Sequence, residues 1–244
     1  MYEERPSRLD GAVVWTRTPG GRGPQAVLPD GCMDLLWTPG RLVVAGPDTR
    51  AYTPENTGRT PYAGVRFAPG TAPVFLGVAA HELRDRRVDA ADIWGDGEAR
   101  RLAERIEDAR DPVAELEAIA LARAADAPGD PDPRLRETVR LLDAGGTVAA
   151  AAAAVGLGPR QLHRRSLDAF GYGPKTLARV LRLQRALALV REGVPFAAAA
   201  AAAGCADQAH LARETRDLAG TTLSAYAASA NRETPQPSGS RTTA

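Results

Sequence analysis

The stretch VAAAAAAVGLGPRQLHRRSLDAFG, from Val148 to Gly171, occurs a second time as FAAAAAAAGCADQAHLARETRDLAG, from Phe196 to Gly220. In each copy an alanine-rich run ends at a glycine, Gly156 or Gly204, and a second helical pattern follows. This order predicts two helix-turn-helix units. Compositional drift in an alanine-rich chain would not repeat the glycine and leucine positions, so we favour a true repeat.

The second helix of each copy divides into two faces. Helical spacing predicts a buried face made of Leu162, Ser166, Ala169 and Phe170 in the first copy and of Leu211, Thr215 and Leu218 in the second. The opposite faces carry arginine and glutamine, which can bind guanine and adenine edges in the major groove of DNA. The expected base-reading residues are Arg160, His163, Arg164, Gln208, Ala209, Ala212 and Arg213.

Charge is distributed unevenly along the chain, although the formal net charge is only +1. Residues 1–131 contain 16 arginines against 21 acidic residues, a net charge of −5, whereas residues 132–232 contain 14 basic residues against 8 acidic ones, a net charge of +6. The basic part is the part with the repeats, as double-stranded DNA requires of a binding domain. The expected phosphate contacts are Arg165, Lys175, Arg179 and Arg216.

Residues 132–232 resemble the DNA-binding domain of the AraC/XylS family of transcription regulators. The resemblance rests on the two units, on the predicted joining helix Pro174–Glu192, on Gly-Tyr-Gly-Pro-Lys after the first reading helix, and on Gly-Thr-Thr-Leu-Ser-Ala-Tyr after the second. Ser166 and Cys205 depart from it, because the family usually has phenylalanine and a larger apolar residue there. We expect a regulator that is not an enzyme and has no cofactor, and the absence of a signal peptide and of a membrane-spanning run predicts that it is cytoplasmic.

Short apolar runs broken by proline and glycine predict strands in the amino-terminal half, followed by helices. The expected fold class is therefore α+β, with a small antiparallel sheet rolled into a barrel or half-barrel, followed by an all-α domain of two helix-turn-helix units joined by a long helix. The expected strands are Ala12–Trp15, Ala26–Pro29, Met33–Trp37, Leu42–Gly46 and Tyr62–Phe67. The expected helices are Pro73–Leu83, Glu98–Asp108, Pro112–Ala125 and Arg134–Ala144.

Composition suggests four parts of the chain. Residues 1–125 form a sensory or dimerising domain, and residues 126–133, with three prolines and three aspartates, form a linker. Residues 134–232 form the DNA-binding domain, and residues 233–244 lack large apolar side chains and are expected to be a disordered tail. The helix pair within residues 98–125 can bury its apolar stripe in the core or, less often, in a dimer seam, so the chain is a monomer or a homodimer.

Val27–Trp37 and His81–Gly95 resemble an uncharacterised domain found ahead of AraC-type domains, which implies sensing without naming a ligand. The candidate ligand-binding residues are Asp30, Cys32, Asp34 and Trp37. Asp30 and Asp34 should share a strand face, where they could bind a cationic ligand or form a salt bridge with Arg41 or Arg66, and we favour the salt bridge. Cys32 can be a small buried hydrophobe, a pocket wall or, least often, a reactive thiol.

Several function classes find little support. The charged start of the chain predicts no signal peptide, no run of apolar residues other than alanine could span a membrane, and two distant cysteines with three scattered histidines predict no metal site. Two alternatives to a ligand-controlled regulator stay open. One is a cysteine-based methyl-acceptor or thiol-responsive DNA repair or regulatory protein, and the other is a structural DNA-binding protein that senses nothing.

Overall fold

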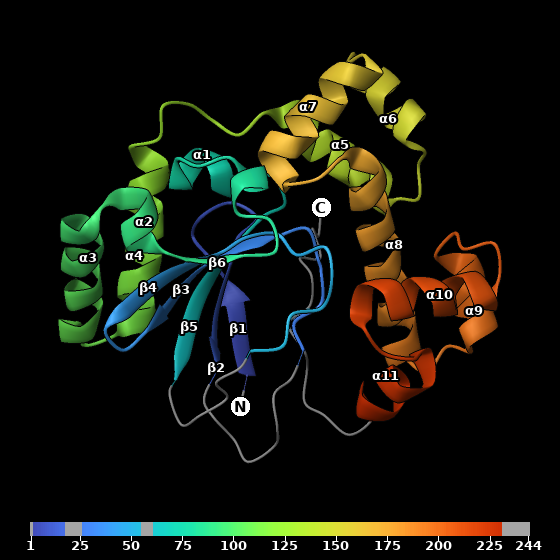
Figure 1. The fold of residues 1–244 in the computed structure, drawn as a ribbon, viewed down its shortest axis with the longest axis horizontal. Helices are drawn as coiled ribbons and strands as arrows, with labels where there is room; N and C mark the ends of the chain where they lie inside the picture. The colour runs from blue at the N-terminus through green and yellow to red at the C-terminus, as the bar shows by residue number, and fades with distance from the viewer. Residues whose placement is uncertain (1, 18–25, 55–60, 231–244) are drawn as a thin grey trace.

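The computed structural model describes residues 2–17, 26–54 and 61–230. Within these ranges an antiparallel sheet with flanking helices is followed by an entirely helical part (Figure 1). The expected α+β class is confirmed. The predicted disordered tail, residues 233–244, lies outside the described ranges.

The sheet has six strands in the order β1-β2-β5-β3-β4-β6, and each neighbouring pair is antiparallel. The strands are β1 (Tyr2–Pro6), β2 (Val13–Arg17), β3 (Met33–Thr38), β4 (Arg41–Ala45), β5 (Tyr62–Phe67) and β6 (Arg87–Asp89). Because β1 and β6 form opposite edges among the described residues, the sheet is open there, and of the two expected forms, barrel and half-barrel, the closed barrel is wrong. Glu3, Glu4 and Arg5 are exposed on the edge strand β1, where charge discourages pairing with another chain.

Two sequence predictions of local structure fail for identifiable reasons. Residues 26–29 form no strand but a single bridge between Val27 and Tyr52, since Pro29 has no N–H to extend a ladder. The helix expected over Pro73–Leu83 stops early, as α1 (Ala72–Leu76), because Gly77 caps it with a left-handed φ of 77°. A short 3-10 helix, η1 (Ala80–Glu82), follows.

Helices cover one face of the sheet. They are α2 (Ala90–Trp94), α3 (Asp96–Asp108) and α4 (Pro112–Ala125), and Figure 1 shows them on the side away from the carboxy-terminal helices. Leu102 and Ile106 of α3 and Leu116 and Ile119 of α4 are buried with the strands in one core. The apolar stripe of the helix pair therefore belongs to the core of the amino-terminal domain.

The carboxy-terminal helices form two compact groups at the ends of one long helix (Figure 1). They are α5 (Pro133–Asp143), α6 (Val148–Ala154), α7 (Pro159–Phe170), α8 (Pro174–Arg191), α9 (Phe196–Ala202), α10 (Gln208–Ala219) and α11 (Leu223–Ala230). Helix α8 contributes to two hydrophobic cores. Its first half, including Leu177 and Val180, packs with α5 to α7, and its second half, including Leu183 and Leu187, packs with α9 to α11.

Residues 126–132, between α4 and α5, contain no helix or strand. We propose the domain boundary there, as the composition suggests.

The two parts of the protein touch at several points. Gln184 Nε2 of α8 donates to the carbonyl of Pro29 at 2.6 Å, and the backbone N–H of Ala51 donates to the carbonyl of Leu218 at 2.7 Å. Helix α7 packs on η1, where Arg84 Nη1 donates to the carbonyl of Gly171 at 3.3 Å. Loops of the amino-terminal domain therefore contact both helix-turn-helix units.

Candidate nucleic-acid interface

The first helix-turn-helix unit is built by local capping and a glycine turn. The Thr147 hydroxyl accepts from the backbone N–H of Ala150 and so starts α6. Gly156 turns the chain with a left-handed φ of 65°, a conformation that favours glycine. Pro159 opens α7, where its missing N–H costs nothing, and the Gln161 side chain accepts from the N–H of Gly158 at 3.0 Å.

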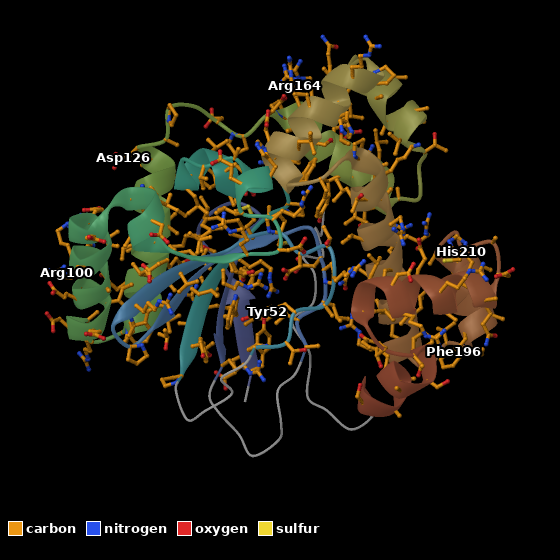
Figure 2. The ribbon with its side chains drawn as sticks, viewed as in Figure 1. Tyr52, Arg100, Asp126, Arg164, Phe196 and His210 are labelled. Carbon is orange, nitrogen blue, oxygen red and sulfur yellow. The ribbon has the colours of Figure 1, made fainter. Side chains whose placement is uncertain are left out.

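The two faces of α7 fall where the sequence places them. Leu162, Ser166, Ala169 and Phe170 are buried, whereas Arg160, His163 and Arg164 are exposed. Figure 2 shows Arg164 on the outer side of the unit, pointing away from the sheet. The His163 ring lies against the backbone of Gly173, since a Cβ there would come within 2.7 Å of Cε1. Arg160 and Arg164 are the exposed arginines of α7, whereas Arg165 is half-buried.

The second unit repeats this arrangement with a different cap. The Asp207 carboxylate accepts from the backbone N–H of His210 at 2.6 Å at the start of α10. The predicted inward residues Leu211, Thr215 and Leu218 are buried. Of the four outward ones, Gln208, Ala209 and Arg213 are exposed and Ala212 is half-buried.

An ion-pair cluster that sequence reasoning missed ties α10 to α8. The Glu214 carboxylate accepts from Arg179 Nε at 2.9 Å and from Arg182 Nε and Nη2 at 3.0 Å each. Burial alone would raise the pKa of Glu214, but the hydrogen bonds from the two arginines outweigh it and lower that pKa. The cluster holds the second reading helix at a fixed place on the long helix.

The expected phosphate contacts differ in their surroundings. Arg179 is bound to Glu214, and Arg165 Nη1 lies 2.7 Å from Asp132 Oδ2, so both guanidinium groups have partners within the protein. Lys175 and Arg216 are exposed, and across the part of the chain that the structure describes neither forms an ion pair.

The candidate ligand-binding residues of the amino-terminal domain do not all lie together. Trp37 points into the core beneath α3 and α4, because it shares the strand face of Met33 and Leu35. Asp34 lies on the opposite face, where Trp15 Nε1 donates to its Oδ1 at 2.7 Å. Asp30 lies in the loop before β3, where it accepts from the backbone N–H of Cys32 at 2.9 Å.

The favoured salt bridge is present with one of its two candidate arginines. Arg66 Nε lies 3.4 Å from Asp30 Oδ2 and 3.5 Å from Asp34 Oδ1. Arg41 pairs instead with Asp89 at 2.7 Å, because the register of β4 and β6 brings them together.

Comparison with known families identifies the helical part. Residues 151–229 match the model of a family described as a helix-turn-helix domain, and they contain the first repeat from Ala151 onward, α8 and the whole second repeat. This carboxy-terminal part of the chain is an AraC-type helix-turn-helix domain. Residues 12–89, ahead of the AraC-type domain, match a family described as a domain of unknown function, DUF6597. No curated protein matches the chain in sequence.

Solved structures of ToxT from Vibrio cholerae resemble the whole chain at low identity. One is 8% identical, covers 93% of this chain and 97% of its own, and has a TM-score of 0.49. A second, bound to (E)-4-(8-methylnaphthalen-1-yl)but-3-enoic acid, is 9% identical, covers 94% of this chain and 99% of its own, and also has a TM-score of 0.49.

Neither a metal-binding cluster nor a membrane-spanning helix occurs among the described residues. They contain no group of three or more histidine, cysteine or acidic side chains that could hold a metal ion. None of their helices is both long enough and apolar enough to cross a lipid bilayer.

Proposed function

We propose that the protein is a sequence-specific transcription regulator whose AraC-type domain reads operator DNA and whose amino-terminal domain responds to a small ligand or a partner. The observation that carries this proposal is the attachment of two exposed reading faces to the two ends of one continuous helix. Helix α8 has 18 residues and so spans about 27 Å at 1.5 Å per residue. Reading helices held about 34 Å apart, one duplex turn, can enter two successive major grooves.

Each proposed base-reading residue has a role that follows from its exposure. Arg160 and Arg164 are suited to bidentate contacts with guanine, and Gln208 to a contact with adenine. The first unit offers two arginines and His163, whereas α10 offers Arg213 and Gln208 among alanines. We therefore assign most of the base discrimination to α7. We assign Ala209 and Ala212 a steric role, because their small side chains allow α10 to approach the floor of the groove closely.

The expected phosphate contacts fall into two groups. Lys175 and Arg216 are exposed and form no ion pair among the described residues, so they can bind phosphate without any rearrangement. Arg165 and Arg179 are each more than a third exposed in their ion pairs. A phosphate could replace Asp132 as the partner of Arg165 at small cost, because exposed pairs contribute little to stability. Arg179 would contact a phosphate while keeping its hydrogen bond to the buried Glu214.

Salt dependence tests this proposal directly. With the full chain and an operator selected from random duplexes, log K should fall steeply and linearly with log salt concentration, because each neutralised phosphate releases counterions. Lys175→Ala and Arg216→Ala should each reduce the slope by about 1. Arg100→Ala, an exposed arginine on α3, is the matched control and should leave the slope unchanged. A flat salt dependence would rule out DNA binding by this domain.

Thiol chemistry gains no support from the two cysteines. Both are buried, and burial raises the pKa of the Cys205 thiol, which disfavours the nucleophilic thiolate.

A further inference from the structure

A buried polar cluster lies on the face of the sheet opposite to α3 and α4. Arg66 is only 3% exposed and lies between Asp30 and Asp34, at 3.4 and 3.5 Å. Within the described residues, its Nε and Nη1 atoms have no hydrogen-bond partner. The two carboxylates lie at ion-pair distance from Nε without completing a hydrogen bond, and Nη1 has no acceptor among the described residues, so a further acceptor would stabilise this buried guanidinium.

The charges of this cluster do not balance. Two carboxylates, Asp30 and Asp34, face one guanidinium. The next arginine along the same row of the sheet, Arg87, is already bound through both Nη atoms to Asp48, at 2.8 and 2.6 Å. One carboxylate is therefore left without a cation of its own beside Arg66, and burial raises the pKa of Asp34, as expected for a carboxyl group that is short of positive charge. An anion would be repelled by it, and an apolar molecule would leave the Arg66 donors unpaired.

The AraC-type domain contributes to the same place. Tyr172, in the turn after α7, is 2% exposed, and its hydroxyl has no hydrogen-bond partner among the described residues. This hydroxyl lies 3.9 Å from where a Cβ on Gly31 would stand. Burial, together with the charges of Asp30 and Cys32, raises the pKa of Tyr172. Gly31 directly follows Asp30, whose Oδ2 lies 3.4 Å from Arg66 Nε, so both unpaired groups border one region.

Two aromatic rings, those of Trp15 and Tyr2, lie beside the polar cluster, where Trp15 Nε1 donates to Asp34. The Trp15 ring stacks on the Tyr2 ring at 6.0 Å between centroids and packs over Gly64, where no side chain would fit. Aromatic faces next to a carboxylate favour a cationic group.

We propose that the cluster of Arg66, Asp30, Asp34 and Tyr172 binds a small organic monocation that carries a hydroxyl, such as an amino alcohol. The ammonium group pairs with the two carboxylates, and the hydroxyl oxygen accepts from Arg66. The Tyr172 hydroxyl completes the site from the other domain. This inference rests on the proposed function, because it names the effector class of the regulator.

Binding at this site is coupled to the arrangement of the two domains. Tyr172 lies directly after Gly171, whose carbonyl accepts from Arg84 and where a Cβ would come within 2.5 Å of Pro47. A ligand that contacts Tyr172 binds more tightly when α7 is docked as it is here. By thermodynamic reciprocity it also favours that placement of α7.

Thermal unfolding and calorimetry of the full chain test the inference, with ethanolamine and serinol as probes and glycolate as the matched acid. Both amines should raise the unfolding midpoint, and glycolate should not. Asp34→Asn should abolish the amine response. Tyr172→Phe should weaken amine binding on the order of tenfold, as expected for one lost hydrogen bond. The same change should leave the stability of the ligand-free protein unaltered. Tyr226→Phe, in α11, should behave as the wild type.

The inference is overturned if neither amine shifts the midpoint at 50 mM, which is about the weakest binding that such a small ligand would be expected to show. It is also overturned if glycolate stabilises the protein, or if Asp34→Asn responds to the amines like the wild type. The proposed function fails separately, through loss of salt-dependent DNA binding. Amine binding with no effect on operator affinity would refute the coupling to α7.

Discussion

The buried carboxylate of Glu117 should make the free energy of unfolding depend on pH. This carboxylate of α4 is buried and holds the segment after β1 by accepting from Arg5 Nη2 at 2.9 Å, the Ser7 hydroxyl at 2.8 Å and the backbone N–H of Arg8 at 2.7 Å. Burial alone would raise its pKa, but these hydrogen bonds lower the pKa from 4.5 to about 2. That difference corresponds to about 3 kcal/mol of unfolding free energy.

The sign of the pH dependence follows from the lowered pKa. The stabilisation is fully present above pH 4.5 and is lost as the pH falls toward 2. Glu117→Gln should therefore lower the free energy of unfolding by about 3 kcal/mol at pH 7, and the gap to the wild type should shrink to less than half by about pH 3.

Urea denaturation followed by tryptophan fluorescence at pH 7, 5, 4 and 3 measures this gap. Glu104→Gln, an exposed carboxylate on α3, is the matched control and should change stability by less than about 0.5 kcal/mol at every pH. A gap between Glu117→Gln and the wild type that stays constant across this range would show that Glu117 does not titrate as argued.

Three further changes test the helical domain. Arg164→Ala should cost about 1–3 kcal/mol of operator affinity and relax specificity at one base pair, whereas Ala212→Ser should be nearly silent; equal losses on operator and random DNA would mean that Arg164 touches phosphate. Leu187→Pro should kink α8 at a cost of about 3 kcal/mol or more, and the footprint of the full chain should fall from two protected grooves to one. Ser166→Ala should stabilise the protein by about 1 kcal/mol in thermal unfolding, because the fully buried hydroxyl has no partner among the described residues. Thr215→Val, at the equivalent position in α10, should not stabilise it, because that hydroxyl donates to the Leu211 carbonyl.

Local patterns predicted the helical domain closely. The connecting helix was expected over Pro174–Glu192 and runs over Pro174–Arg191, because its apolar period, the opening proline and the absence of internal glycine are all local signals. The inward and outward faces of α7 followed from spacing alone. The pairing of Arg179 with Glu214 did not, since those residues are 35 positions apart and meet only when α10 packs on α8.

The amino-terminal domain was harder to predict because its structure depends on contacts distant in sequence. The strand β1, with the sequence YEERP, has no apolar alternation and forms only because β2 offers it an edge. Trp37 and Asp34 were grouped as candidate ligand contacts, although odd spacing along a strand puts them on opposite faces. Arg66 was named only as a salt-bridge partner; its burial and unpaired donors follow from the order of the strands.

Helix α8 lends one half of its apolar surface to each reading unit, and this sharing makes the two units mechanically interdependent. If α9 to α11 came apart, Leu183 and Leu187 would be exposed on a helix whose other end still anchors the first unit. Melting of either unit thus loosens the helix on which the other is built. The two repeats can therefore recognise different base sequences and still unfold together as one cooperative unit.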